Sequence, residues 1–135
     1  MRAGEANAVP DGEPGAVHIR GTVHDGEGAP VPDALLELWQ VSPRELFARC
    51  SCEPGEGDYE VVTLLPGDEA PWIDVSVFAR GMLNRVVTRI YFAPDDVPGF
   101  VPPGRRATLI AHDDGDGYRF DIRLQGPTET VFFDV

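Results

Sequence analysis

The sequence predicts an all-β fold, an antiparallel β-sandwich of about eight short strands. Apolar and polar residues alternate in short runs, a pattern typical of strands with one buried face. Fifteen glycines and thirteen prolines among 135 residues separate these runs with turns. The runs recur at spacings of roughly 8 to 15 residues with no clear helical period, as expected for a sandwich.

Eight segments carry the strand pattern. They are residues 17–23, 35–40, 46–52, 59–65, 73–80, 86–92, 106–112 and 118–124. In the first segment Val17, Ile19 and Val23 share one face, which predicts that this face is buried. The second segment is apolar almost throughout, which predicts burial on both faces.

Turns and one long loop divide the later segments. Residues 66–71 and 81–84 are predicted turns. Residues 93–104 contain four prolines and two glycines, so we expect a long surface loop there. Residues 106–112 are predicted to be a strand, with a helical turn at 106–109 as the alternative.

The chain divides into a flexible N-terminal arm, residues 1–16, and a single β-sandwich domain, residues 17–135. The arm is rich in Gly, Pro, Ala and acidic residues and has no hydrophobic period. No stretch approaches the roughly 20 consecutive apolar residues of a membrane span. The first residues also lack the apolar run of a signal peptide, so we expect a cytoplasmic protein.

The charge excludes several classes of function. The formal net charge is −12, and all 11 basic residues are arginines. Such a chain repels phosphate backbones and anionic lipids, so we expect neither a nucleic-acid nor a membrane partner. The absence of lysine also excludes Schiff-base chemistry and a P-loop lysine.

The two cysteines, Cys50 and Cys52, are predicted to be free thiols. In a strand they share a face two residues apart, where a disulfide would close a strained ring. Free thiols are the usual state of cysteines in the cytoplasm. No further ligands lie near them in the sequence to suggest a zinc site.

Side chains suited to metal binding or nucleophilic catalysis are sparse. His18, His24 and His112 lie at no spacing that brings two of them to one ion, so we expect exposed histidines and no bound metal. The acidic segment 113–117 lacks the spaced ligands of a calcium loop and is predicted to be a hairpin turn. No serine or cysteine lies in a nucleophile context, so we predict no catalytic residue in this chain.

Arg80 ends the segment 73–80, directly before Gly81. A guanidinium in this place can present its planar fork to a carboxylate. Arg85 and Arg89 lie nearby in the next segment, so this hairpin concentrates positive charge in an acidic chain. Composition alone favours the other interpretation, a salt bridge to one of the 23 acidic residues.

Three separated motifs are more specific. They lie at residues 17–23 with 31–40, residues 74–81 with 88–92, and residues 118–126 with 129–133. In this order they resemble the opening strands, the central hairpin and the C-terminus of the intradiol ring-cleavage dioxygenases. The resemblance covers about residues 17–135, with gaps, and implies the prealbumin-like β-sandwich of that family.

The resemblance also bears on metal binding. In that family the catalytic chain binds a non-haem ferric ion through two tyrosines and two histidines, and a His-x-His pair corresponds to positions 72–74 here. This sequence has Trp72-Ile73-Asp74 instead. Because tryptophan cannot bind iron, the resemblance implies that Trp72 and Asp74 are degenerate metal-site positions and that this chain holds no iron.

The same resemblance implies a second chain. In the family's two-chain members a beta subunit carries the non-haem Fe(III), and an alpha subunit of the same fold helps to wall the active site. This chain resembles the alpha type, so its implied partner is the beta subunit, in heterodimers within a larger assembly. The resemblance reverses the interpretation of Arg80, which is then expected to bind the carboxylate of a small aromatic acid substrate.

Two other hypotheses stay open at this point. One is a stand-alone transthyretin-like β-sandwich, a binding or structural module without catalysis, which would share the hairpin at residues 30–34. The other is an autonomous iron enzyme with unexpected ligands such as His18, Asp74 and a tyrosine.

Overall fold

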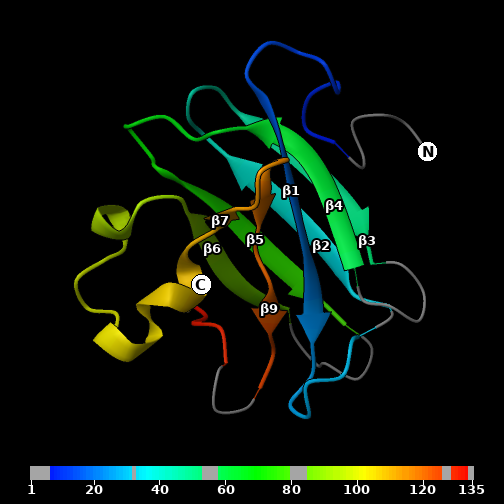
Figure 1. The fold of residues 1–135 in the computed structure, drawn as a ribbon, viewed down its shortest axis with the longest axis vertical. Coiled ribbons are helices and arrows are strands. Elements are labelled where there is room, and N and C mark those ends of the chain that lie inside the picture. The colour runs from blue at the N-terminus through cyan, green and yellow to red at the C-terminus, as the bar shows by residue number, and fades with distance from the viewer. Residues whose placement is uncertain (1–6, 32, 53–57, 80–84, 126–128, 134–135) are drawn as a thin grey trace.

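The computed structural model describes residues 7–31, 33–52, 58–79, 85–125 and 129–133. Two β-sheets pack face to face, so the predicted β-sandwich is confirmed (Figure 1). Within these residues two short 3₁₀ helices, η1 (Pro94–Asp96) and η2 (Pro103–Leu109), lie together on one side of the sandwich.

The first sheet is built around β1 (Ala16–His24). This strand pairs antiparallel with β4 (Asp58–Leu64) and parallel with both β8 (Tyr118–Arg119) and β9 (Ile122–Arg123). β7 (His112–Asp113) pairs antiparallel with β8. Because the sheet runs in the order β4-β1-β8-β7, β4 lies at an edge of it.

The second sheet is antiparallel throughout. It runs in the order β3 (Leu46–Ser51), β2 (Leu35–Gln40), β5 (Trp72–Phe78) and β6 (Val86–Tyr91). The β5–β6 pair forms the hairpin that the alternating pattern predicted. The register places each residue of this hairpin on a known face of the sheet.

The hydrophobic core lies between the two sheets. Alternate residues of the long strands point into it, as the period of two predicts. The large core side chains that are almost fully buried are Ile19, Val23, Leu36, Val61, Ile73, Val75, Val77, Ile90, Phe120 and Ile122. On β5 the inward set is odd-numbered, so Trp72 and Asp74 lie on the outer face of the second sheet.

The strand predicted at residues 106–112 is wrong over most of its length. The chain forms η2 as far as Leu109, and only His112 and Asp113 pair as a strand. Pro102 and Pro103 lie just before this segment, and proline is well suited to the first turn of a helix. Arg106 donates hydrogen bonds to three backbone carbonyls of the preceding loop, which holds the helix against it. The helical turn that was the alternative at 106–109 is therefore confirmed.

Part of the N-terminal segment lies against the edge strand β4. The backbone N–H of Val62 donates to Asn7 Oδ1 at 2.9 Å, and the N–H of Ala8 donates to the Val62 carbonyl at 2.9 Å. Val9 is only 3% exposed. From Asn7 onwards, residues that the composition assigned to the flexible arm therefore make specific contacts with the sandwich.

Cys50 and Cys52 are free, as their spacing predicted, and both are buried in the core. Burial raises the pKa of Cys50 to about 12 and that of Cys52 to about 11. Both groups therefore stay protonated thiols near neutral pH, and thiols are poor nucleophiles.

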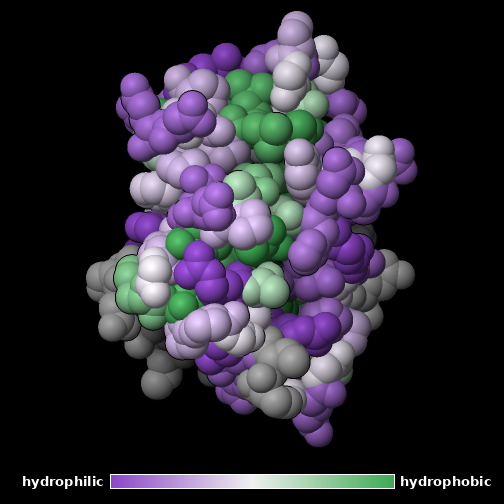
Figure 2. All heavy atoms as spheres, turned by 60° about the vertical axis from the view of Figure 1, so that its left-hand side comes forward, coloured by the Kyte–Doolittle hydropathy of each residue, from purple (hydrophilic) through white to green (hydrophobic). Residues whose placement is uncertain are grey.

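Apolar side chains also reach the surface. Figure 2 shows apolar residues gathered in a band along the middle of one face, between hydrophilic borders. The large apolar residues exposed in the described part of the chain are Val41, Phe47, Leu65 and Phe100. No helix in the described ranges has the length and apolarity needed to cross a membrane.

Candidate functional site

The outer face of the second sheet brings together Trp72 and Asp74, the two positions that the family resemblance marked as degenerate metal sites. Trp72 lies opposite Tyr91 and Asp74 lies opposite Arg89 in the β5–β6 register. Residues two apart on a strand share a face, so these four side chains converge on one region. Phe133 joins them, because its N–H donates to the Val87 carbonyl of β6 at 2.8 Å. We call these five residues the Asp74 cluster.

Hydrogen bonds use both oxygens of the Asp74 carboxylate. Arg89 Nε donates to Oδ1 at 3.2 Å, and Trp72 Nε1 donates to Oδ2 at 3.3 Å. Arg89 Nη1 also donates to the hydroxyl of Tyr91 at 3.3 Å. The exposed fractions of the Asp74 and Arg89 side chains are 21% and 33%, so the ion pair is partly shielded from water.

Two aromatic rings lie close to the Arg89 guanidinium. Its central carbon lies 4.5 Å from the ring centroid of Trp72 and 5.1 Å from that of Phe133. Both distances fall within the range of cation–π attraction. Burial lowers the pKa of Arg89, but the hydrogen bond to Tyr91 and the charge of Asp74 outweigh it, so the pKa is raised and the cation persists.

The Asp74 cluster does not fit a ferric ion. The indole of Trp72 offers no lone pair, and the one carboxylate already accepts from two donors. Arg89 fixes a positive charge next to that carboxylate, so a metal cation would be repelled there. In the described part of the chain no three His, Cys, Asp or Glu residues are grouped to hold a metal.

The tyrosines serve other contacts. Tyr59 is fully buried; its hydroxyl donates to the Phe120 carbonyl, and burial raises its pKa well above the usual value. Tyr118 packs edge-on against Phe92 with ring centroids 5.0 Å apart. Tyr91 accepts the hydrogen bond from Arg89.

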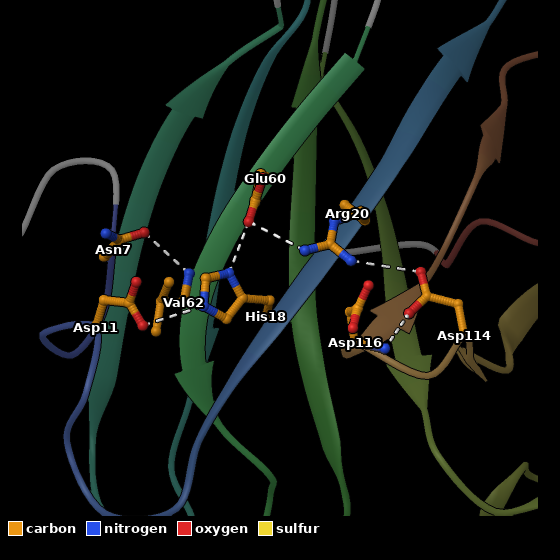
Figure 3. A network of polar contacts seen from close by, with 8 residues as sticks. All are labelled: Asn7, Asp11, His18, Arg20, Glu60, Val62, Asp114 and Asp116. Atoms are coloured by element: carbon orange, nitrogen blue, oxygen red, sulfur yellow. Dashed lines mark hydrogen bonds and ion pairs between the residues drawn. The ribbon is translucent and has the colours of Figure 1, made fainter.

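His18 lies in a different polar network, on the outer face of the first sheet (Figure 3). Its Nδ1 lies 2.6 Å from Glu60 Oε2 and its Nε2 lies 3.1 Å from Asp11 Oδ1. Arg20 bridges Glu60 at 3.3 Å and Asp114 at 3.5 Å. Each ring nitrogen of His18 faces a carboxylate, an arrangement that favours the doubly protonated imidazolium.

The position of His18 excludes the autonomous iron site with His18 and Asp74 as ligands. His18 points outward from the first sheet and Asp74 points outward from the second, with the hydrophobic core between them. The two side chains therefore cannot share one ion.

The other acidic and histidine candidates behave as solvated surface groups. His112 is exposed, and His24 lies 3.2 Å from the carbonyl of Gly28. Residues 113–117 form the turn between β7 and β8, which confirms the predicted hairpin. Asp113 and Asp114 accept hydrogen bonds from backbone N–H groups within that turn.

His18 makes the free energy of unfolding depend on pH. Hydrogen bonds to Glu60 and Asp11 raise its pKa above 6.5, while His18 and Arg20 lower the pKa of Glu60 below 4.5. The stabilisation from His18 is present below pH 6.5 and is lost as pH rises through its raised pKa. That from Glu60 is present above pH 4.5 and is lost as pH falls through its lowered pKa.

We therefore expect His18→Gln to destabilise the protein most between about pH 4.5 and 6.5, with a smaller effect above this window. Urea unfolding across a pH series measures this. His112→Gln changes an exposed histidine and is the control, expected to keep the wild-type profile. A His18→Gln profile parallel to that of the wild type at every pH would contradict the prediction.

Arg80 lies outside the described residues, as do residues 81–84. The sequence marked Trp72 and Asp74 as site positions. It indicated Arg89 only as one of several arginines close together in the chain. The signal that could have found it is the register of the hairpin, which places Asp74 opposite Arg89. No local signal marks Phe133, which reaches the cluster from the far end of the chain.

Comparison with solved structures identifies the class of fold. Catechol 1,2-dioxygenase from Pseudomonas arvilla C-1 aligns with a TM-score of 0.64 at 22% identity, over 91% of this chain and 56% of that one. The fold is thus that of the intradiol ring-cleavage dioxygenases, as the three sequence motifs predicted.

Sequence relatives identify the family. No protein-family model matches the chain. It is 38% identical to the protocatechuate 3,4-dioxygenase alpha chain of Burkholderia cepacia, over 95% of this chain and 81% of that one. It is 35% identical to the Pseudomonas putida alpha chain, over 94% and 80%. The chain belongs to the protocatechuate 3,4-dioxygenase alpha-chain family and is an alpha-type subunit of an oxidoreductase.

The beta chain of the Burkholderia cepacia enzyme is also related. It is 29% identical to this chain, over 92% of this chain and 71% of that one. These relatives do not favour the alternative of a stand-alone transthyretin-like module.

Proposed function

We propose that this chain is the non-catalytic alpha subunit of a protocatechuate 3,4-dioxygenase. Its partner is a beta subunit that carries the non-haem Fe(III), and together they open the protocatechuate ring between its two hydroxylated carbons with dioxygen. The observation that carries the proposal is the Asp74 cluster, whose residues do not fit a ferric ion although the chain belongs to this family.

Other features support a partner and a cytoplasmic location. Similarity to both an alpha and a beta chain supports pairing between two chains of one fold. The exposed apolar residues offer contact area for such a partner. The two free thiols support residence in the reducing cytoplasm.

Co-expression with a beta-type chain from the same source tests the assembly. We expect the two chains to co-elute, with iron in proportion to the beta chain and ring cleavage only by the complex. This chain purified alone is expected to be colourless, free of iron and inactive. Iron and turnover in this chain alone, or two chains that elute separately, would contradict the proposal.

Within this assembly Arg80 is proposed to bind the substrate carboxylate. A charged hydrogen bond is worth about 1.5–3 kcal/mol, so Arg80→Ala is expected to raise KM for protocatechuate by roughly tenfold or more, with a smaller change in kcat. Steady-state kinetics of the complex measure this. Arg85→Ala alters a nearby exposed arginine as the control, and equal KM values for the two variants would exclude the role of Arg80.

A further inference from the structure

We propose that Arg89 is an internal cation that cross-links β5, β6 and the C-terminal segment 129–133, in place of any metal at the outer face of the second sheet. The proposal rests on the contacts of the Asp74 cluster and does not depend on a partner subunit or on the substrate.

The register fixes the first half of the cross-link. Asp74 and Arg89 lie directly opposite each other on neighbouring antiparallel strands, so backbone pairing brings their side chains together. The carboxylate is held further by the indole N–H of Trp72. Arg89 therefore has a fixed partner, Asp74, that depends only on the pairing of β5 with β6.

The C-terminal segment supplies the second half. The Phe133 ring lies close to the guanidinium of Arg89, which is on β6. The backbone N–H of Phe133 donates to the Val87 carbonyl of the same strand. The Thr88 hydroxyl donates to the Val131 carbonyl at 2.8 Å, so the segment is anchored to β6 at a second point. Arg89 thus connects a carboxylate on β5 with an aromatic ring that follows it by more than forty residues in the sequence.

The guanidinium suits this role for a geometric reason. It is planar, so it can lie against Trp72 and Phe133 while its edge donates to Asp74 and to Tyr91. A lysine ammonium keeps the charge but lacks this plane and this fork. The charges of Asp74 and Arg89 cancel each other. A metal cation near Asp74 would be repelled by the guanidinium of Arg89.

Hydrogen exchange in the full chain tests the cross-link. We expect Arg89→Gln to speed exchange of the amides in residues 129–133 at least about tenfold, because the segment opens locally. Arg89→Lys should give a smaller increase. Arg85 is exposed and directly precedes β6, so Arg85→Gln is the matched control. It should leave the exchange rates of residues 129–133 unchanged.

A double-mutant cycle tests the ion pair independently. The urea midpoints of Asp74→Asn, Arg89→Gln and the double variant are compared, and the loss in the double variant should be clearly less than the sum of the single losses. Additive losses together with unchanged exchange in both Arg89 variants would overturn the proposal. If Arg89→Gln fails to fold, hydrogen exchange in residues 129–133 is compared between Arg89→Lys and Arg85→Gln. Faster exchange in Arg89→Lys supports the proposal, and equal rates overturn it.

Discussion

Gly21→Ala is expected to lower the free energy of unfolding by about 3 kcal/mol or more, because the new methyl group has no room. A Cβ at Gly21 would overlap the Phe120 carbonyl oxygen and lie 2.7 Å from its carbon. It would also lie 3.0 Å from the ring of Tyr59. The carbonyl is backbone and accepts the Tyr59 hydroxyl, so it cannot move without breaking the β1–β8 junction.

Urea unfolding of the variant measures this loss. Gly99→Ala is the matched control, because a Cβ there meets no atom within 4 Å. The control is expected to keep the wild-type midpoint. Equal midpoints for the two variants would show that strand β1 can shift from Phe120 at little cost.

Phe120→Ala is expected to cost about 3–5 kcal/mol, the range for emptying an aromatic site in a core. Phe120 is 2% exposed and packs in the core between the sheets. Its backbone N–H also donates to the Arg20 carbonyl at 2.9 Å, so the surrounding strands are held in place and cannot close the cavity. Such a loss is a large part of the 5–15 kcal/mol that stabilises a typical domain.

The same substitution at Phe100 is the control for Phe120→Ala. Phe100 is 77% exposed, and its ring meets Phe133 with centroids 6.4 Å apart. Its loss is expected to change the free energy of unfolding by no more than about 1 kcal/mol. Thermal unfolding of both variants measures the difference, and similar melting temperatures would contradict the burial of Phe120.

The alternating strands could be predicted from the sequence because burial on one face imposes a period of two. Val17, Ile19 and Val23 show this in β1. The period fails at residues 106–112, where apolar residues cover β6 from a 3₁₀ helix rather than from a strand. The prolines and glycine at 102–104 were the physical signal for a helix start, and they outweigh the apolar run.

The candidate site was predictable only in part. Trp72 and Asp74 were found because a resemblance marked their positions. The role of Arg89 depends on strand register, which a hairpin pattern suggests but does not determine. The contribution of Phe133 depends on how the chain returns to β6 after many turns, and no local spacing encodes that.

The contact of Asn7 and Ala8 with Val62 has a consequence for solubility. An edge strand with free donors and acceptors can recruit the edge of another molecule and seed intermolecular sheets. Here a donor and an acceptor near the end of β4 are already taken by the chain itself, and Val9 seals the place with an apolar side chain. This short stretch therefore protects part of the β4 edge from pairing with a strand of another molecule.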